Sequence, residues 1–317
     1  MPSLFNNEAK SFLDIVRRNA DRKAKSEEAL RFYDDQQDDV TLALIRRRFS
    51  SPEGFRIFHT NMVRKIVNRR ATAYQTSPKR TFEGWDQEAG EALYAAANVD
   101  AVMKRAARLT KLLKTSVLQV RHGDHGLTLN VLPPHILDAT WVEPEHPTRM
   151  IVTHAAERPD HVTYSDWTAT GFQRRDAQGR PIRTEGNEAN SNPYGVLPFV
   201  PLFDRLPDDR FFLPGSDDLI GAQKALNVGL ANLWRAVELQ AHGQAVAKGL
   251  HPGDPIATGP DKVIILPADG SFEFANTNAP IEEILQALEF VMRQTAATND
   301  VGADVFDLSK RAESGSA

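Results

Sequence analysis

Two histidines and an aspartate stand together in His122-Gly123-Asp124-His125, the densest group of potential metal ligands in the sequence. Imidazole and carboxylate groups can hold a divalent metal ion, so one interpretation is a metal-dependent hydrolase built on His122, Asp124 and His125. The spacing does not match the helical zinc site, which needs histidines at positions i and i+4. The group lies between two segments with strand periodicity, where glycine and aspartate are common turn residues. We therefore interpret it as an exposed hairpin turn.

Other patterns that carry catalytic chemistry are missing from the sequence. It has no cysteine, which excludes disulfides, thiolate metal sites and cysteine nucleophiles. It also lacks the phosphate-binding loop, the dinucleotide-binding glycine fingerprint and the Gly-x-Ser-x-Gly elbow. Glu282, Glu283 and Glu289 could pair as acid and base, but carboxylates at a helix start more often interact with the helix dipole. We expect a protein that is not an enzyme and binds no cofactor.

The composition is that of a folded chain with more than one packing unit. It has 317 residues, of which 41% are hydrophobic and 25% are charged. No segment approaches the roughly 18 apolar residues of a membrane span, and the start does not resemble a secretory signal. We therefore expect no membrane association, and a protein of the cytoplasm or of something assembled there.

Charge is unevenly distributed along the sequence. Residues 1–120 carry a net charge of +7, whereas residues 121–317 carry −11. The two halves either meet different electrostatic partners or neutralise one another across an assembly interface. The basic runs Arg46-Arg47-Arg48, Arg64 to Arg70 and Lys104 to Lys114 lack the interleaved aromatics of a single-strand stacking platform. Phosphate contacts and ion pairs within an oligomer both stay open for them.

The N-terminal part has helical periodicity and the middle has strand periodicity, which predicts an α+β fold. Apolar spacing predicts helices over residues 8–35, 38–48, 58–76 and 86–113. The basic side chains of the first helix are expected to form a solvated face: Arg17, Arg18, Arg22, Lys23 and Lys25. Alternation predicts strands over residues 115–120, 127–132, 150–153, 161–165 and 168–174. The apolar segment 192–203 contains prolines, which exclude a central strand or a helix interior.

Two long helices flank a short β segment in the last third of the sequence. The first starts at Ser216 and is expected to end between Gly243 and Lys248, which gives a length of about 50 Å. Residues 262–266 and 271–275 predict a hairpin around the turn 267–270. The second helix, over residues 281–299, would be about 28 Å long.

Both long helices carry an apolar stripe. In the first it consists of Leu219, Ala222, Leu226, Leu230, Leu233 and Val237, and in the second of Ile281, Ile284, Leu285, Leu288 and Val291. Two helices can cover one another on one face only, so we expect neighbouring subunits to cover the rest. An ordinary helical hairpin inside a globular core is the alternative.

Four stretches, together with the order of the elements, point to a known family. They are Asn61-Met62-Val63 to Tyr74, Asn192-Pro193-Tyr194-Gly195 to Leu202, Gly215-Ser216-Asp217-Asp218 to Asn227, and Ala303-Asp304-Val305-Phe306 to Ala317. In this order they resemble the portal proteins of tailed bacteriophages, which form the ring at the capsid vertex through which DNA is packaged and ejected. The resemblance covers nearly the whole chain.

The resemblance implies a wing, a two-helix stem and a small β clip. Residues 1–213 correspond to the wing, which is helical over 1–114 and strand-rich over 115–213. Residues 214–249 and 281–300 correspond to the two stem helices, and residues 250–280 to the clip. Residues 301–317 correspond to the start of the tunnel loop, where the chain stops. The tunnel loop normally continues into a long helix and a crown, so the resemblance implies a truncated or unusually short member.

The resemblance also implies partners. Such proteins assemble as homo-oligomers, usually dodecamers, around double-stranded DNA, and they contact the terminase large subunit, the head–tail connector and the major capsid protein. The expected location is the portal vertex of the virion, after assembly in the host bacterial cytoplasm. A channel should not grip DNA, and the −11 charge of residues 121–317 suits a weakly repulsive wall.

Individual residues follow from this interpretation. Arg293, Lys310 and Arg311 are candidates for sparse positive charges near the channel, and Lys262, Asp269 and Glu273 are candidates for contacts between the clip and its partners. The stem is expected to pack through Leu219, Leu226, Leu230, Leu233, Ile284 and Leu288. A metal-dependent hydrolase at His122 and an oligomeric scaffold unrelated to phages are the alternatives.

Overall fold

The computed structural model describes residues 2–49, 52–123, 126–241, 244–248, 271–275 and 280–306. The chain divides into two units. The first consists of Met1–Gln36, Asn61–Gly221 and Thr298–Gly302, and the second of Gln37–Thr60, Ala222–Ala297 and Ala303–Ala317.

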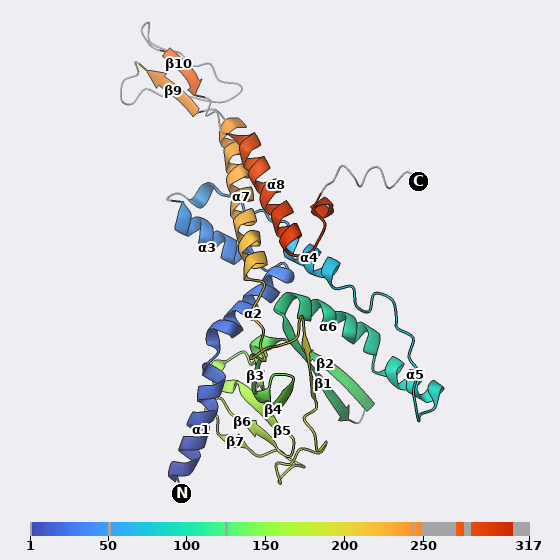
Figure 1. Cartoon of the computed structure of the whole chain (residues 1–317). Helices are drawn as coiled ribbons and strands as arrows, with labels where there is room; N and C mark the ends of the chain where they lie inside the picture. The colour runs from blue at the N-terminus through green and yellow to red at the C-terminus, as the bar shows by residue number, and fades with distance from the viewer. Residues whose placement is uncertain are drawn as a thin grey trace. The chain divides into compact units, whose positions relative to one another are not determined.

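Eight α-helices and ten strands lie within the described residues (Figure 1). The helices are α1 (Pro2–Arg17), α2 (Ala20–Tyr33), α3 (Asp38–Arg48), α4 (Met62–Arg70), α5 (Gln87–Ala96), α6 (Val99–Leu113), α7 (Asp217–Ala241) and α8 (Ile281–Thr298). The strands are β1 (Thr115–Gly123), β2 (Gly126–Leu132), β3 (Leu137–Glu143), β4 (His146–His154), β5 (Thr163–Thr168), β6 (Phe172–Arg175), β7 (Pro181–Ile182), β8 (Phe199–Phe203), β9 (Gln244–Lys248) and β10 (Ser271–Ala275). The predicted α+β class is confirmed.

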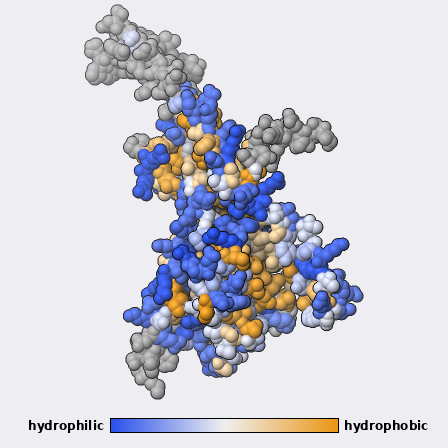
Figure 2. All heavy atoms as spheres, viewed as in Figure 1, coloured by the Kyte–Doolittle hydropathy of each residue, from blue (hydrophilic) through white to orange (hydrophobic). Residues whose placement is uncertain are grey.

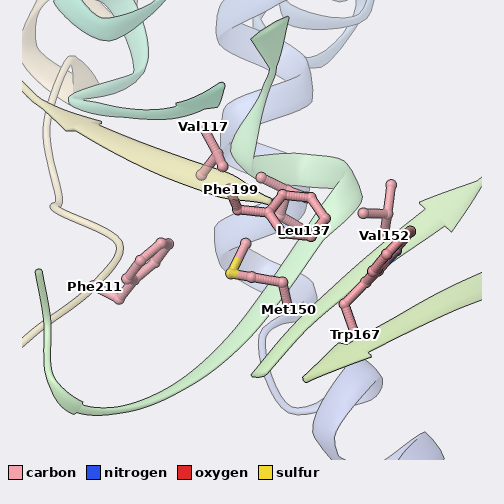
Figure 3. Close-up of a cluster of buried hydrophobic side chains, with 7 residues drawn as sticks. All are labelled: Val117, Leu137, Met150, Val152, Trp167, Phe199 and Phe211. Atoms are coloured by element: carbon pink, nitrogen blue, oxygen red, sulfur yellow. The ribbon is translucent and has the colours of Figure 1, made fainter. Parts of the chain in front are cut away.

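Two antiparallel sheets form the centre of the first unit. Their strand orders are β2-β1-β8 and β3-β4-β5-β6-β7. One face of each sheet contributes to a shared core of Val117, Leu137, Met150, Val152, Trp167, Phe199 and Phe211 (Figure 3). Met150 and Val152 are two residues apart on β4, so their side chains lie on the same face. Burial of these large apolar side chains is what joins the two sheets.

The opposite face of the five-stranded sheet carries two buried carboxylates. Ile151 of β4 lies opposite both Asp138 of β3 and Asp166 of β5, so the three residues form one row across the sheet. Phe12 of α1 packs on this face against Ile151 and Tyr164. The helical N-terminus therefore covers a face that is partly ionic, and each carboxylate needs a cationic partner.

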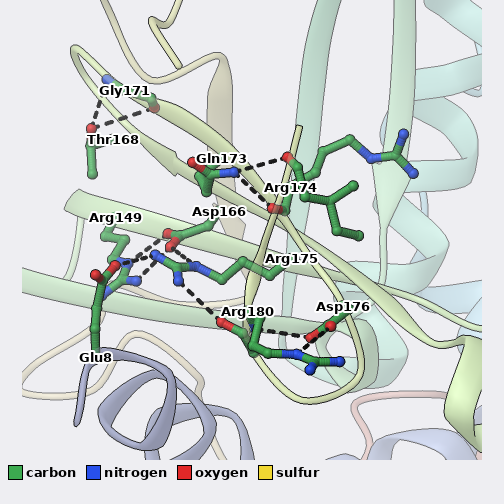
Figure 4. A network of polar contacts seen from close by, with 12 residues as sticks. Glu8, Arg149, Asp166, Thr168, Gly171, Gln173, Arg174, Arg175, Asp176 and Arg180 are labelled. Carbon is green, nitrogen blue, oxygen red and sulfur yellow. Dashed lines mark hydrogen bonds and ion pairs between the residues drawn. The ribbon is translucent and has the colours of Figure 1, made fainter. Parts of the chain in front are cut away.

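Asp166 is at the centre of an ionic network (Figure 4). Arg149 donates to both oxygens of this carboxylate, at 2.6 Å each, and Arg175 donates to it at 3.1 Å. The hydrogen bond to Asp166 raises the pKa of Arg149. Arg175 also donates to Glu8 of α1 at 2.8 Å. The network therefore ties α1 to the sheet.

Asp138 is paired with the next helix. Lys23 of α2 donates to its carboxylate at 2.5 Å, and Arg22 lies 3.4 Å from it. Burial lowers the pKa of Arg22 to about 10, against the opposing effect of Asp138. Burial also raises the pKa of Asp138, although Lys23 and Arg22 act in the opposite direction. The prediction of a solvated basic face is therefore wrong for Arg22 and Lys23.

Several predicted helices are divided or shortened. The 8–35 helix is interrupted after Arg17, and the 86–113 helix is interrupted at Asn98, whose φ of 50° is left-handed. The 58–76 helix is reduced to α4 at both ends, and its start is fixed by Asn61, which accepts from the amide of Arg64 at 2.8 Å. The α3 prediction of residues 38–48 is confirmed.

The C-terminal elements also differ in extent. The first long helix ends at Ala241, close to the predicted end at about Gly243, but its predicted extension to Lys248 is wrong. Residues 244–248 are instead strand β9, which pairs antiparallel with β10. The strand predicted over 271–275 is confirmed. Residues 262–266 and the turn 267–270 lie outside the described residues, and α8 agrees with the helix predicted over 281–299.

Strand β8 occupies an edge of the three-stranded sheet, in agreement with its proline content. Asp204 donates its amide to the carbonyl of Lys114, and Val120 donates to the carbonyl of Pro198. Hydrogen-bonded pairs therefore recur at even-numbered residues of this segment, which places Pro201, opposite Val117, in a non-hydrogen-bonded pair. The backbone nitrogen of Pro201 thus faces the outer edge of the sheet, so its missing N–H removes no hydrogen bond between β8 and β1.

An ion-pair cluster fixes the end of this strand to α6. Lys111 donates to one oxygen of Asp204 at 2.5 Å, and Lys114 donates to the other at 3.1 Å. The Asp204 side chain is only 12% exposed. Burial alone would raise the pKa of Asp204, but the hydrogen bond from Lys111 and the charge of Lys114 outweigh it and lower the pKa below its ordinary 3.8.

We predict that this cluster makes stability depend on pH. A carboxyl group with a lowered pKa in the folded state stabilises the fold above its ordinary pKa and loses that contribution as the pH falls through the folded value. Asp204→Asn should therefore lower the free energy of unfolding at pH 7 by about 1–2 kcal/mol. In urea titrations from pH 7 down to about pH 2, the difference from the parent protein should shrink below about pH 4. The exposed Asp209→Asn is the control, and an equal effect of both variants would contradict the assignment.

Candidate assembly surface

The group of potential metal ligands lies at a hairpin. Gly123 of β1 pairs with Gly126 of β2, so only two residues connect the strands, and the predicted hairpin at this place is confirmed. His122 is exposed and lies opposite Leu127. Asp124 and His125 lie outside the described residues. Among the described residues, no three His, Asp or Glu side chains are grouped as metal ligands would be.

The C-terminal helices offer a different kind of site, because burial changes along α7. Leu219 and Leu226 are 2% and 1% exposed, whereas Leu230 and Leu233 are half-buried. Farther along the helix, Trp234 and Val237 are 46% and 39% exposed. The chain therefore buries the first half of the predicted stripe by itself and leaves the second half in contact with solvent.

Helix α8 shows a similar incomplete burial. Ile284 and Leu288 are half-buried, but Leu285 is 45% and Phe290 is 63% exposed. Figure 2 shows hydrophobic side chains among the charged ones on the visible surface of this helical region. Single exposed apolar residues are normal on a folded protein, whereas several on two adjacent helices indicate an interaction surface.

Helices α7 and α8 lie side by side and approach closely (Figure 1). A Cβ atom placed on Gly229 of α7 would collide with the side chain of Leu288 of α8. The absence of a side chain at Gly229 therefore permits this contact. The predicted packing residue Leu288 thus has an inward partner in its own chain.

A buried polar network holds α3 against α7. The side-chain nitrogen Nδ2 of Asn227 donates to Oε1 of Gln37 at 2.8 Å and to Oγ1 of Thr41 at 3.1 Å. Gln223 donates to Asn227 and to the carbonyl of Thr60, at 2.7 Å each. All four side chains are at most 1% exposed. Buried polar groups are costly when unpaired, so this network permits one arrangement of the two helices.

Beside this network, α3 and α7 enclose an open groove of about 630 Å³. Its apolar lining comes from Leu44, Phe49, Ala225, Val228 and Gly229, with Asn232 at one side. Its basic lining comes from Arg47, Arg48 and Lys224. The groove thus combines an apolar floor with positive charge.

The predicted channel and clip residues are only partly described. Arg293 is exposed on α8 and lies 3.6 Å from Glu289, with both side chains more than half exposed. Glu273 belongs to β10, opposite Val246 of β9. Lys262, Asp269, Lys310 and Arg311 lie outside the described residues. The roles given to these residues stay predictions.

Sequence reasoning missed two parts of this surface. It identified an apolar stripe on each helix, including the exposed Val237 and Leu285, but not the exposed Trp234 or Phe290. It also missed the network around Asn227. Gln223 and Asn227 are four residues apart and lie next to the apolar stripe of Ala222 and Leu226, and this spacing is the signal that could have indicated a polar contact. None of the described helices is long and apolar enough to span a bilayer.

Comparison with known proteins finds a distant structural likeness. No family model and no curated protein matches the chain. Among solved structures, a chain from the neck of an empty gene transfer agent (GTA) particle, computed with C6 symmetry, is similar with 12% identity and a TM-score of 0.39. The match covers 75% of this chain and 64% of that chain, so this chain spans less than two thirds of its length.

We predict that Asn227 is essential for the contact between α3 and α7. Asn227→Ala removes the hydrogen bonds of Asn227 with Gln37, Thr41 and Gln223 from a buried site, which should cost about 2–4 kcal/mol. Hydrogen exchange of the backbone amides of α3 and α7, measured by mass spectrometry, should increase accordingly. Asn232→Ala on the same helix is the matched control and should change little. Unchanged protection in the Asn227 variant would show that the network does not hold the helices.

Proposed function

We propose that this chain is a portal-type subunit. Copies stand side by side in a closed ring, a dodecamer, at the capsid vertex of a tailed phage particle, and double-stranded DNA passes through the centre. The observation that carries this proposal is the helix pair α7–α8, which leaves Trp234, Val237, Leu285 and Phe290 exposed. Neighbouring copies supply the apolar cover that the single chain lacks.

The two outer faces of the pair differ, which favours a ring over a two-fold dimer. The exposed apolar residues of α7 are Trp234 and Val237, and those of α8 are Leu285 and Phe290, which lie on two flanks of that helix among acidic neighbours. Unlike surfaces that meet head to tail generate rings when the rotation closes. The order of the sequence elements supports the same conclusion through their resemblance to portal proteins.

The remaining roles complete the proposal. Arg293, Lys310 and Arg311 supply sparse positive charge near the channel, so that DNA is guided without being held. Lys262, Asp269 and Glu273 contact the terminase large subunit and later the head–tail connector, and the major capsid protein surrounds the ring. The protein acts as a structural part of the virion and not as an enzyme.

The test is the assembly state of purified protein. Negative-stain images and sedimentation velocity should show closed rings of uniform size. Leu285→Glu with Phe290→Glu should raise the concentration needed for half-maximal assembly at least tenfold, because charges then replace buried apolar contacts. The unfolding free energy of the monomer should change by less than about 0.5 kcal/mol, because both side chains are exposed in it.

Val196→Glu with Leu206→Glu provides the matched control. Val196 and Leu206 are 63% and 80% exposed in the first unit and are not part of the helix pair, so this variant should still form rings. A monodisperse monomer of the parent protein at high concentration would falsify the proposed function.

A further inference from the structure

The basic side of the groove between α3 and α7 has unpaired charge. Arg47 and Arg48 are exposed, and neither forms an ion pair with any residue that the structure describes. Both stand in the last turn of α3, where cations interact favourably with the helix dipole. That interaction accounts for their position on the helix, but not for the apolar groove beside them.

One flank of α8 has the complementary character. Glu283 and Phe290 are seven residues apart, which places them on the same side of the helix after two turns. Phe290 is 63% exposed, and Glu283 is exposed and has no ion-pair partner among the described residues. This flank thus combines an aromatic side chain with a negative charge, and the groove combines an apolar floor with positive charge.

We propose that α8 of one copy docks in the α3–α7 groove of the neighbouring copy. Phe290 enters between Leu44 and Val228, and Glu283 lies near Arg47 and Arg48. This inference rests on the proposed ring and assigns its subunit contact to particular residues. Aromatic anchors in desolvated pockets commonly dominate such contacts, while complementary charge sets orientation and partner choice.

A second copy fits the groove better than a nucleic acid does. A phosphate backbone would satisfy Arg47 and Arg48 but would place sugars and phosphates against the apolar floor of Leu44, Val228 and Gly229. The size of the groove, about 630 Å³, also accommodates a large side chain. The small side chain of Ala225, which also lines the groove, permits close approach of a second helix.

Disulfide trapping between separately produced variants tests this contact. The chain has no cysteine, so every cross-link comes from the introduced thiols. Ala225→Cys and Phe290→Cys proteins are mixed as monomers, assembled and oxidised, and the cross-linked dimer is measured on a non-reducing gel. A dimer of the two variants can form only between copies. The matched control replaces Phe290→Cys with Leu285→Cys, which lies on the other flank of α8 and is also exposed. We expect at least fivefold more dimer from the test mixture.

Charge exchange provides a second readout that needs no cross-link. Arg47→Glu with Arg48→Glu should raise the half-assembly concentration about tenfold, and Glu283→Lys should raise it severalfold. Combining all three substitutions should restore assembly to within about threefold of the parent protein. Restoration by the combined variant would not occur if the substitutions acted only by weakening the fold.

The outcomes separate this inference from the proposed function. If rings form, the cross-linked dimer exceeds its control and the combined charge variant restores assembly, both the groove contact and the proposed function are supported. A second outcome is that rings form while the yield of cross-linked dimer equals that of the control, or while charge exchange leaves assembly unaffected. Either result overturns the groove contact and leaves the proposed function intact. A third outcome is that the double variant Arg47→Glu with Arg48→Glu loses binding of a 30-base-pair DNA duplex while its assembly is unchanged. That result would assign the groove to nucleic acid and overturn the inference. The absence of rings in the parent protein overturns both.

Discussion

The second unit depends on a small set of buried amide and hydroxyl groups around Asn227. Hydrophobic contacts between helices tolerate rotation and sliding, because they are not directional. The hydrogen bonds that join Asn227 to Gln37, Thr41 and Gln223 are directional, so rotation or sliding of the helices would break them inside a buried site. The position of α3 on α7 is thereby fixed. The groove beside Arg47 and Arg48, and the direction in which the remaining faces of α7 point, follow from that one contact.

Local sequence signals were sufficient for much of the fold. Period-two alternation gave β1, β2, β4 and β5, and the acidic first turn and basic last turn of α3 marked both its ends. Helix interruptions were less predictable. The cap at Asn61 can be recognised in the sequence, but the left-handed backbone of Asn98 has no local signature. Strand β3 was missed because Asp138 is buried on it, and its charge is compensated only by Arg22 and Lys23 from a distant helix.

The candidate surface was predictable in outline only. Periodicity identifies the side of a helix that packs inward, and Leu226 and Ile284 were found in this way. Phe290 was not found, because it interrupts a polar face without any repeat. Val237 and Leu285 belong to the predicted stripes and are nevertheless exposed. Leu219 and Leu226 are buried within one chain, which sequence spacing cannot distinguish from burial between two chains. The groove needs α3 and α7, which are far apart in sequence, so no local pattern could reveal it.

The proline at the edge of β8 has a consequence for crowded conditions. An open strand edge with regularly spaced donors invites a strand from another molecule, and such pairing can propagate into aggregates. Pro201 removes one outward donor from that edge. Copies synthesised together are therefore less prone to pair edge to edge through β8. Association then depends on side chains, whose shape and charge can distinguish a correct neighbour from an incorrect one.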